Sequence, residues 1–197
     1  MKLVLLVALA AAGVLEAGSL PFTPRLRAFT SGDELRAFDG TSLWVRPTGG
    51  GPWRPYPLPV SRALDVDGEE DRLWVLDRDG VLVLKGASSK KRLNICAGAG
   101  SLAVVRGGVW CVSPTDTERR VTVWRYTSDG LELGRWLIPL PREEDDASLP
   151  AIARAAGMWW ELVADGDGAV GVSAFQGNLL LAPVKGGGRV VPWPSPL

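Results

Sequence analysis

Residues 72–84 read RLWVLDRDGVLVL, with two short apolar runs on either side of a polar turn. Apolar runs of this length, bounded by turn residues and rich in valine and tryptophan, are typical of strands buried on both faces. Asp79 and Gly80 lie between the runs, and both residue types tolerate positive φ, which makes the pair a hairpin signal. The stretch therefore predicts two antiparallel strands joined by a tight turn.

The same pattern of short apolar runs and polar turns recurs along the chain. Trp44, Trp74 and Trp110 each lie inside an apolar triplet, and they are 30 and 36 residues apart. A weaker fourth copy aligns Val170 with Trp110, 60 residues further on, after an insertion. Repeats of this size cannot bury their own faces and must stack on their neighbours. We therefore interpret the three tryptophans as equivalent residues that pack between stacked repeats.

Residues 72–84 resemble the inner strands of a β-propeller blade. They are similar to NHL, YVTN and regulator-propeller repeats, which favour a Gly/Asp turn, a Leu-Trp-Val strand and a second turn. The resemblance covers most of residues 33–197 loosely and residues 60–86 strongly. It implies an all-β fold, a small β-propeller or propeller-like arc of about four blades, at about 40 residues each. Because those families usually have six or more blades, we expect a small closed ring, an open arc, or half of a ring that a homodimer completes.

The resemblance sets the expected division of the chain. We expect a single domain over residues 18–197, with blades at about 33–59, 60–96, 97–141 and 149–197. Between the last two blades, Ser148 is a suitable cap, Pro150 suits a first helical turn, and Gly157 is a stop signal. The sequence therefore predicts one short helix near 148–157 in an otherwise all-β protein.

Residues 1–17 have the organisation of a signal peptide. A positive start at Lys2 is followed by an apolar run of 13 residues, from Leu3 to Leu15, and by small residues around Ala17. This length suits a leader, whereas a membrane-spanning helix needs about 20 apolar residues. We expect an extracytoplasmic protein, periplasmic or secreted, whose leader is either cleaved or retained as an anchor. No later stretch is long enough to predict a transmembrane helix.

The two cysteines, Cys96 and Cys111, leave two alternatives open. Export permits a disulfide between them, which would close a loop of about 15 residues. Cys111 also occupies an apolar position of a predicted strand, where a free thiol is well accommodated. The sequence therefore fits either a disulfide or two buried thiols.

Several function classes are excluded by composition. The chain contains no histidine, which rules out histidine-dependent nucleophile pairs and histidine-ligated metals. Its 22 basic and 22 acidic residues balance, so the sequence carries no general affinity for nucleic acid. The carboxylate runs lie in charged loops without the apolar setting that a general acid needs.

Asp65, Asp67 and Asp71 are a candidate calcium site. With Gly68 they resemble the loops of FG-GAP propeller repeats, in which alternating carboxylates supply the oxygen ligands that Ca²⁺ requires. Ala63 stands where that pattern has its first acid, and the partial second copy consists of Asp165 and Asp167. The alternative is that these residues form ordinary Asp/Gly turns and that the protein has no cofactor.

Met158, Trp159 and Trp160 are the candidate binding residues. Neighbouring residues of a strand point to opposite faces, so one tryptophan is expected to be exposed to a ligand, unless both are enclosed. The sequence thus predicts an exported, non-enzymatic binding or scaffold module that engages an envelope protein, a peptide or a glycan. The alternative is a calcium-dependent propeller hydrolase or lyase.

Overall fold

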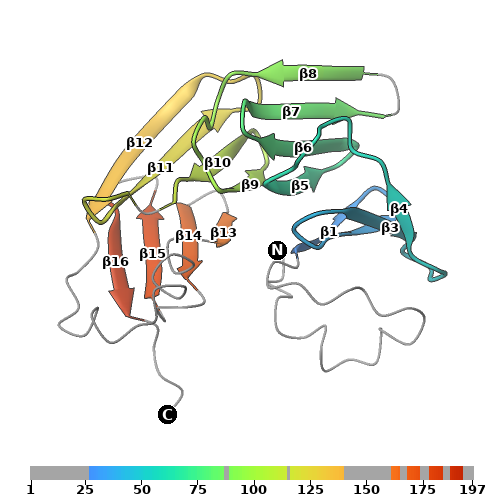
Figure 1. Cartoon of the computed structure of the whole chain (residues 1–197), viewed down its shortest axis with the longest axis horizontal. Coiled ribbons are helices and arrows are strands. Elements are labelled where there is room, and N and C mark those ends of the chain that lie inside the picture. Colours follow the sequence, from blue (N-terminus) through green and yellow to red (C-terminus); the bar gives the residue numbers. More distant parts are fainter. Residues whose placement is uncertain are drawn as a thin grey trace, which may run out of the picture. The chain divides into compact units, whose positions relative to one another are not determined.

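The computed structural model describes residues 27–86, 89–114, 116–139, 161–164, 168–173, 178–183 and 187–192. Over these residues the chain forms four four-stranded antiparallel sheets, coloured in sequence order in Figure 1. The same residues contain no helix, and therefore none that could cross a membrane. The predicted all-β, propeller-like fold is confirmed, whereas the signal peptide at 1–17 and the helix near 148–157 lie outside the described residues.

The chain divides into two compact units, residues 1–93 and 94–197. The first unit contains two sheets: β1 (Arg27–Ser31), β2 (Glu34–Phe38), β3 (Leu43–Pro47) and β4 (Arg54–Tyr56), then β5 (Asp65–Glu69), β6 (Arg72–Asp77), β7 (Gly80–Lys85) and β8 (Ser89–Leu93). The second unit contains β9 (Ser101–Val105), β10 (Gly108–Val112), β11 (Arg120–Thr127) and β12 (Glu132–Pro139), then β13 (Glu161–Ala164), β14 (Gly168–Ser173), β15 (Asn178–Pro183) and β16 (Arg189–Pro192).

The first sheet begins before the predicted start of its blade. Gly32 adopts a φ of +59°, and the turn at Gly32 and Asp33 folds β1 back onto β2, with Ser31 opposite Glu34. Glycine is favoured at such a position because it has no Cβ to oppose positive φ. The first sheet therefore includes Arg27 to Ser31, which the expected range of 33–59 leaves out.

The strand register corrects the predicted equivalence of the tryptophans. Trp74 and Trp110 lie on β6 and β10, the second strands of their sheets, but Trp44 lies on β3, the third strand of the first sheet. Ser31–Glu34 closes the first hairpin of the first sheet, and Glu69–Arg72 closes the first hairpin of the second. When these two pairs are aligned, Arg36 of β2 is the residue equivalent to Trp74 of β6. The local Leu-Trp-Val string repeats, but it belongs to different strands in the two sheets.

The core of the second unit forms around Trp110, which is 0% exposed. Its ring stacks on Trp136 of β12, with centroids 5.1 Å apart and planes at 25°. Side chains from β9, β11 and β12 complete this cluster, together with Leu162 of β13 and Ala169 of β14. Trp136 also covers Gly134, where a Cβ would lie 2.6 Å from the indole ring. The two sheets of this unit are therefore joined by one apolar layer.

The core of the first unit also joins two sheets. Phe38 and Leu43 of the first sheet cluster with Val66, Leu73 and other buried side chains of the second. Beside this cluster, Ser31 Oγ donates a 2.7 Å hydrogen bond to the backbone carbonyl of Glu70. Because burial of apolar surface contributes about 25 cal/mol per Å² removed from water, this layer stabilises the contact between the two sheets.

A buried acceptor fixes the turn after the second strand in each sheet of the first unit. Asp39 Oδ1 accepts the backbone N–H groups of Thr41 and Ser42, and its Oδ2 accepts the Trp44 indole N–H at 2.9 Å. Asp77 Oδ1 accepts the backbone N–H of Asp79 and a 2.6 Å bond from Arg92. Each carboxylate thus satisfies turn donors that the ladder leaves unpaired.

The second unit has a serine at this position. The backbone N–H of Ser113 bonds to the carbonyl of Thr122, and Ser113 Oγ accepts the Thr122 N–H at 2.9 Å. The turn therefore keeps an acceptor but has no charge there.

These acceptors predict a dependence of stability on acid. Burial raises the pKa of Asp39 and of Asp77, but their hydrogen bonds outweigh it and the net pKa of each is lowered from 3.8. The native state therefore holds these protons less tightly than the unfolded chain, and the stabilisation is present above pH 3.8 and lost as pH falls below it. We expect Asp39→Asn to lower the free energy of unfolding by about 1–2 kcal/mol at pH 7, because the amide cannot accept from all three donors.

Urea unfolding at pH 7 and at pH 3 measures this effect. The difference in free energy of unfolding between wild type and Asp39→Asn should narrow at pH 3, where the carboxyl group of the unfolded chain is largely protonated and the stabilisation from Asp39 is being lost. Asp33→Asn is the matched control, because Asp33 is exposed in the neighbouring turn and should change stability little at either pH. An equal loss in both variants would rule out the anchoring role of Asp39.

Candidate functional site

Asp65 and Asp67, two members of the predicted calcium site, lie on β5 and share one face of that strand. Arg27 of β1 approaches both: its Nη2 is 3.3 Å from Asp65 Oδ2 and its Nη1 is 3.9 Å from Asp67 Oδ2. The other oxygen of each carboxylate accepts a backbone N–H, from Val66 and from Gly68. A guanidinium thus supplies the positive charge that these two buried carboxylates need.

Asp71 is separated from the other two acids. It lies in the turn after β5 and pairs with Lys85 at 3.6 Å, with both side chains 59% exposed. Among the residues that the structure describes, no three Cys, Asp or Glu side chains are grouped to hold a metal ion. Asp165 and Asp167 lie outside those residues. Arg27 was missed from sequence because it is distant in the chain and no local pattern links it to β5.

Cys96 and Cys111 form a disulfide, with their Cα atoms 5.8 Å apart. Cys96 lies in the bend before β9 with a φ of +59°, and Cys111 lies in the middle of β10, fully buried. The bend brings Cys96 beside the second strand, which the sequence pattern alone did not show. The disulfide is therefore the alternative that the structure adopts. The other candidate residues, Met158, Trp159 and Trp160, lie outside the described part of the chain.

The outer strands of the first two sheets carry features that guard a sheet edge. β4 has only three residues and contains Pro55, which cannot donate to another strand. β8 carries the exposed cations Lys90, Lys91 and Arg92 along its length. Short strands, prolines and lysines are the usual protection of natural sheets against the addition of a further strand.

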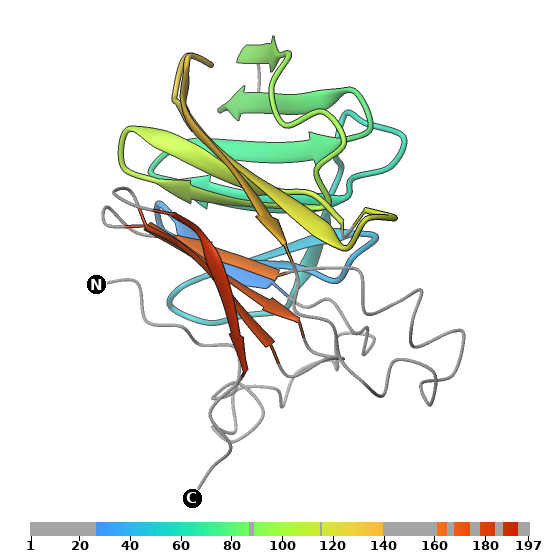
Figure 2. The same ribbon diagram turned by 90° about the vertical axis from the view of Figure 1, so that its left-hand side faces the viewer.

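The outer strand of the third sheet, β12, is different. It has eight residues and carries Leu133 and Leu137, which are 49% and 57% exposed, and Leu131 just before it is 66% exposed. Figure 2 shows β12, in gold, along the edge of its sheet beside β11. These leucines are the exposed large apolar side chains of the described residues. β12 is therefore a long outer strand of its sheet and carries exposed apolar side chains.

A bulge shapes this edge. Arg125 of β11 lies opposite Gly134, but the next residue, Tyr126, lies opposite Glu132, so Leu133 is the extra residue of β12. A bulge bends the strand and redirects side chains. The Asp129-Gly130 turn signal predicts a strand at 131–138, but not its exposed leucines. The sequence did contain a signal for exposed apolar side chains. Apolar residues occur at both odd and even positions of 131–138, whereas a strand with one buried face needs them only at alternate positions.

Charged groups lie between the leucines of β12. Arg135 Nη2 donates to Glu132 Oε2 at 2.8 Å, and this hydrogen bond raises the pKa of the guanidinium. Burial, reinforced by the Glu132 carboxylate, raises the pKa of the Tyr126 phenol on the adjoining strand. The edge is therefore apolar at Leu133 and Leu137, with one paired cation between them. It offers apolar contacts for binding.

No family model matches the sequence, and no curated protein matches it. The chain is similar to solved structures of Hsv2, which are β-propeller proteins. Hsv2 of Kluyveromyces lactis has 12% identity and a TM-score of 0.52, over 86% of this chain and 50% of that one. Hsv2 of Kluyveromyces marxianus has 14% identity and a TM-score of 0.52, over 85% of this chain and 49% of that one. The K. lactis protein with loop 6CD replaced by a Gly-Ser linker has 14% identity and a TM-score of 0.53, over 85% of this chain and 52% of that one.

These similarities support the propeller-like fold of the strands described above. At such low sequence identity, the similarities are evidence for the fold and not for a shared function. The chain spans about half the length of the solved structures that it matches.

Proposed function

We propose that the protein is an exported, non-enzymatic binding module that holds an extended segment of a partner protein along β12. The observation that carries the proposal is the length of this outer strand and its exposed leucines, which distinguish it from the short β4 and the lysine-bearing β8. An extended segment can add to such an edge as a further strand, with main-chain hydrogen bonds for affinity and side-chain contacts for specificity. Leu133 and Leu137 would provide the apolar contacts with the side chains of that segment.

Two features support the location outside the cytoplasm. The first is the leader-like composition of residues 1–17. The second is the disulfide between Cys96 and Cys111, because structural disulfides persist in oxidising compartments and are rare in the cytosol. An extracytoplasmic binding module would meet its partner among periplasmic, envelope or secreted proteins.

The site favours a protein partner over the other ligands considered. Leucine side chains offer no flat ring for a sugar to stack on, whereas they suit the apolar side chains of a peptide. The arrangement at β5 weighs against a calcium-dependent hydrolase, since the Arg27 guanidinium lies where a cation would have to approach Asp65 and Asp67. A binding role needs no catalytic group, in agreement with the absence of histidine from the sequence.

The proposal predicts that charge on β12 abolishes capture of the partner. The test compares cross-linked pull-downs from envelope extract with wild type and with the variant Leu133→Lys/Leu137→Lys. We expect the variant to lose a protein that wild type retains, because each lysine would have to leave water or repel the incoming strand. Both side chains are exposed, so the melting temperature should change by no more than a few degrees.

A control with the same added charge makes the test specific. Asn94→Lys/Thr117→Lys also adds two cations to exposed positions of the second unit, outside the β12 strand itself. It should retain the partner. Identical capture by wild type and by the β12 variant would reject the proposal. Light scattering of the same proteins identifies a second copy as the occupant if wild type is a dimer and only the β12 variant is a monomer.

A further inference from the structure

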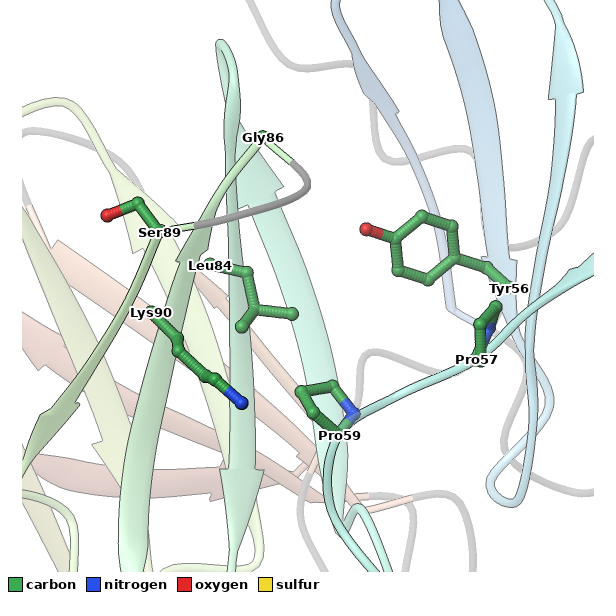
Figure 3. Close-up of a pocket in the computed structure, with 7 residues that line it drawn as sticks. All are labelled: Tyr56, Pro57, Pro59, Leu84, Gly86, Ser89 and Lys90. Atoms are coloured by element: carbon green, nitrogen blue, oxygen red, sulfur yellow. The ribbon is translucent and has the colours of Figure 1, made fainter.

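The first unit contains a pocket between its two sheets, distant in sequence from β12. It has a volume of about 150 Å³ and is lined by residues of β4, β7, β8 and the adjoining loops: Tyr56, Pro57, Pro59, Leu84, Gly86, Ser89 and Lys90. In Figure 3 the Tyr56 ring and the Lys90 side chain both extend into this space from opposite sheets. A cavity of this volume holds a group about as large as benzene.

The apolar part of the pocket wall is held in place by the core. Leu84 is 7% exposed and belongs to the core that joins the two sheets. Tyr56 packs against the same core, and the Arg36 guanidinium lies over its ring at 5.4 Å from the centroid. Pro57 and Pro59 follow on the loop, and proline rings have little conformational freedom to lose when a ligand binds. These surfaces suit a compact apolar group.

Lys90 gives the pocket a positive charge. It lies directly opposite Leu84 in the β7–β8 register and therefore shares the face that looks toward Tyr56. Arg92, two residues on, has its charge matched by Asp77. Lys90 makes no ion pair with any residue that the structure describes, and its ammonium is directed into the space in Figure 3. The pocket therefore combines apolar side chains with a cation that has no ion pair among the described residues.

We propose that this pocket binds a carboxylate joined to a compact apolar group of about the size of a leucine side chain. The apolar group lies on Leu84, between the Tyr56 ring and the two prolines, and the carboxylate lies at the Lys90 ammonium. Two sources share this chemistry: the free C-terminus of a peptide with an apolar last residue, and a small free carboxylic acid. This site is separate from the β12 edge, so either proposal can fail without the other.

Titration of the ¹⁵N-labelled protein, followed by NMR chemical shifts, tests the site with defined probes. The probes are N-acetyl-leucine, N-acetyl-leucinamide, and the peptide Ala-Ala-Ala-Leu with a free or an amidated C-terminus. We expect N-acetyl-leucine to shift the resonances of residues around Leu84 with a Kd of about 1–10 mM. The neutral amide should bind about three- to tenfold more weakly, because a partly exposed ion pair contributes modestly. The difference should shrink at about 0.5 M salt.

Two substitutions on β8 separate this site from general attraction to a basic strand. Lys90→Gln should remove the preference for the acid over the amide. Lys91→Gln is the matched control, because Lys91 lies opposite Val83 on the other face of the sheet and should leave the preference intact. Both residues are exposed, so neither change should impair folding.

The outcomes are distinct. Equal affinity for acid and amide, equal effects of Lys90→Gln and Lys91→Gln, or no shifts near Leu84 at about 20 mM probe would each overturn the proposal. Tighter binding of the free-ended peptide than of N-acetyl-leucine, by about tenfold or more, supports the site and assigns it to peptide C-termini. Equal binding of the two supports the site and assigns it to small acids.

Discussion

Trp110→Ala is expected to lower the free energy of unfolding of the second unit by about 3–5 kcal/mol. The indole is 0% exposed, stacks on Trp136, and lies within the cluster that includes Leu162 and Ala169 of the neighbouring sheet. Its removal costs the apolar burial and leaves a cavity that the rigid strands on both sides cannot fill. Urea unfolding followed by far-UV circular dichroism measures the loss.

A second tryptophan provides the control. Trp53 is half-buried, lies outside the core clusters and contacts the Arg46 guanidinium, which is 4.9 Å from its ring centroid. Trp53→Ala should therefore cost about 1 kcal/mol or less. The near-ultraviolet circular dichroism of the Trp110–Trp136 stack should disappear only in Trp110→Ala. Similar losses of stability in the two variants would show that Trp110 is not the centre of the core.

Removal of the disulfide is expected to have the next largest effect. The bond closes a loop with a sequence separation of 15 between Cys96 and Cys111. A loop of this length restricts the unfolded chain by about 3 kcal/mol. For a protein of this size each kcal/mol corresponds to about 2–4 °C, so Cys96→Ser/Cys111→Ser should melt about 6–12 °C below the oxidised wild type.

Reductant provides an internal check on this prediction. Dithiothreitol should lower the melting temperature of wild type toward that of the double serine variant and should leave the variant unchanged. A wild type whose melting temperature is indifferent to reductant, and equal to that of the variant, would show that the bond adds no stability. Free-thiol titration of the unfolded protein before and after reduction confirms which form each sample contains.

The sequence was most informative where local chemistry determines local structure. Asp79-Gly80 predicts the β6–β7 hairpin, and Gly80 there has a φ of +116°. Asp129-Gly130 likewise predicts the turn into β12, and Gly130 has a φ of +102°. Each is a case in which two neighbouring residues tolerate a conformation that most side chains avoid. Local signals of this kind were enough to define the all-β class.

The sequence was least informative where the answer depends on which strands are neighbours. The Leu-Trp-Val string at Trp44 matches that at Trp74, yet the two lie on the third and the second strands of their sheets. Arg27 reaches the β5 carboxylates across a tertiary contact, and Leu133 is displaced by a bulge that only the register reveals. None of these placements follows from spacing along the chain, because each depends on the pairing of strands.

The turn after the second strand has a consequence for recognising relatives of this chain. In the first unit an indole from Trp44 and a guanidinium from Arg92 bond to carboxylates at matching places, so the two repeats share the oxygen and differ in the group that reaches it. The hydrogen-bond donor at this turn can therefore differ between repeats while the acceptor oxygen is retained. Asp39, Asp77, Ser113 and Ser173 each follow or end the second strand of a sheet. A search profile built on an oxygen-bearing residue there would align all four repeats, whereas one built on tryptophan misaligns the first.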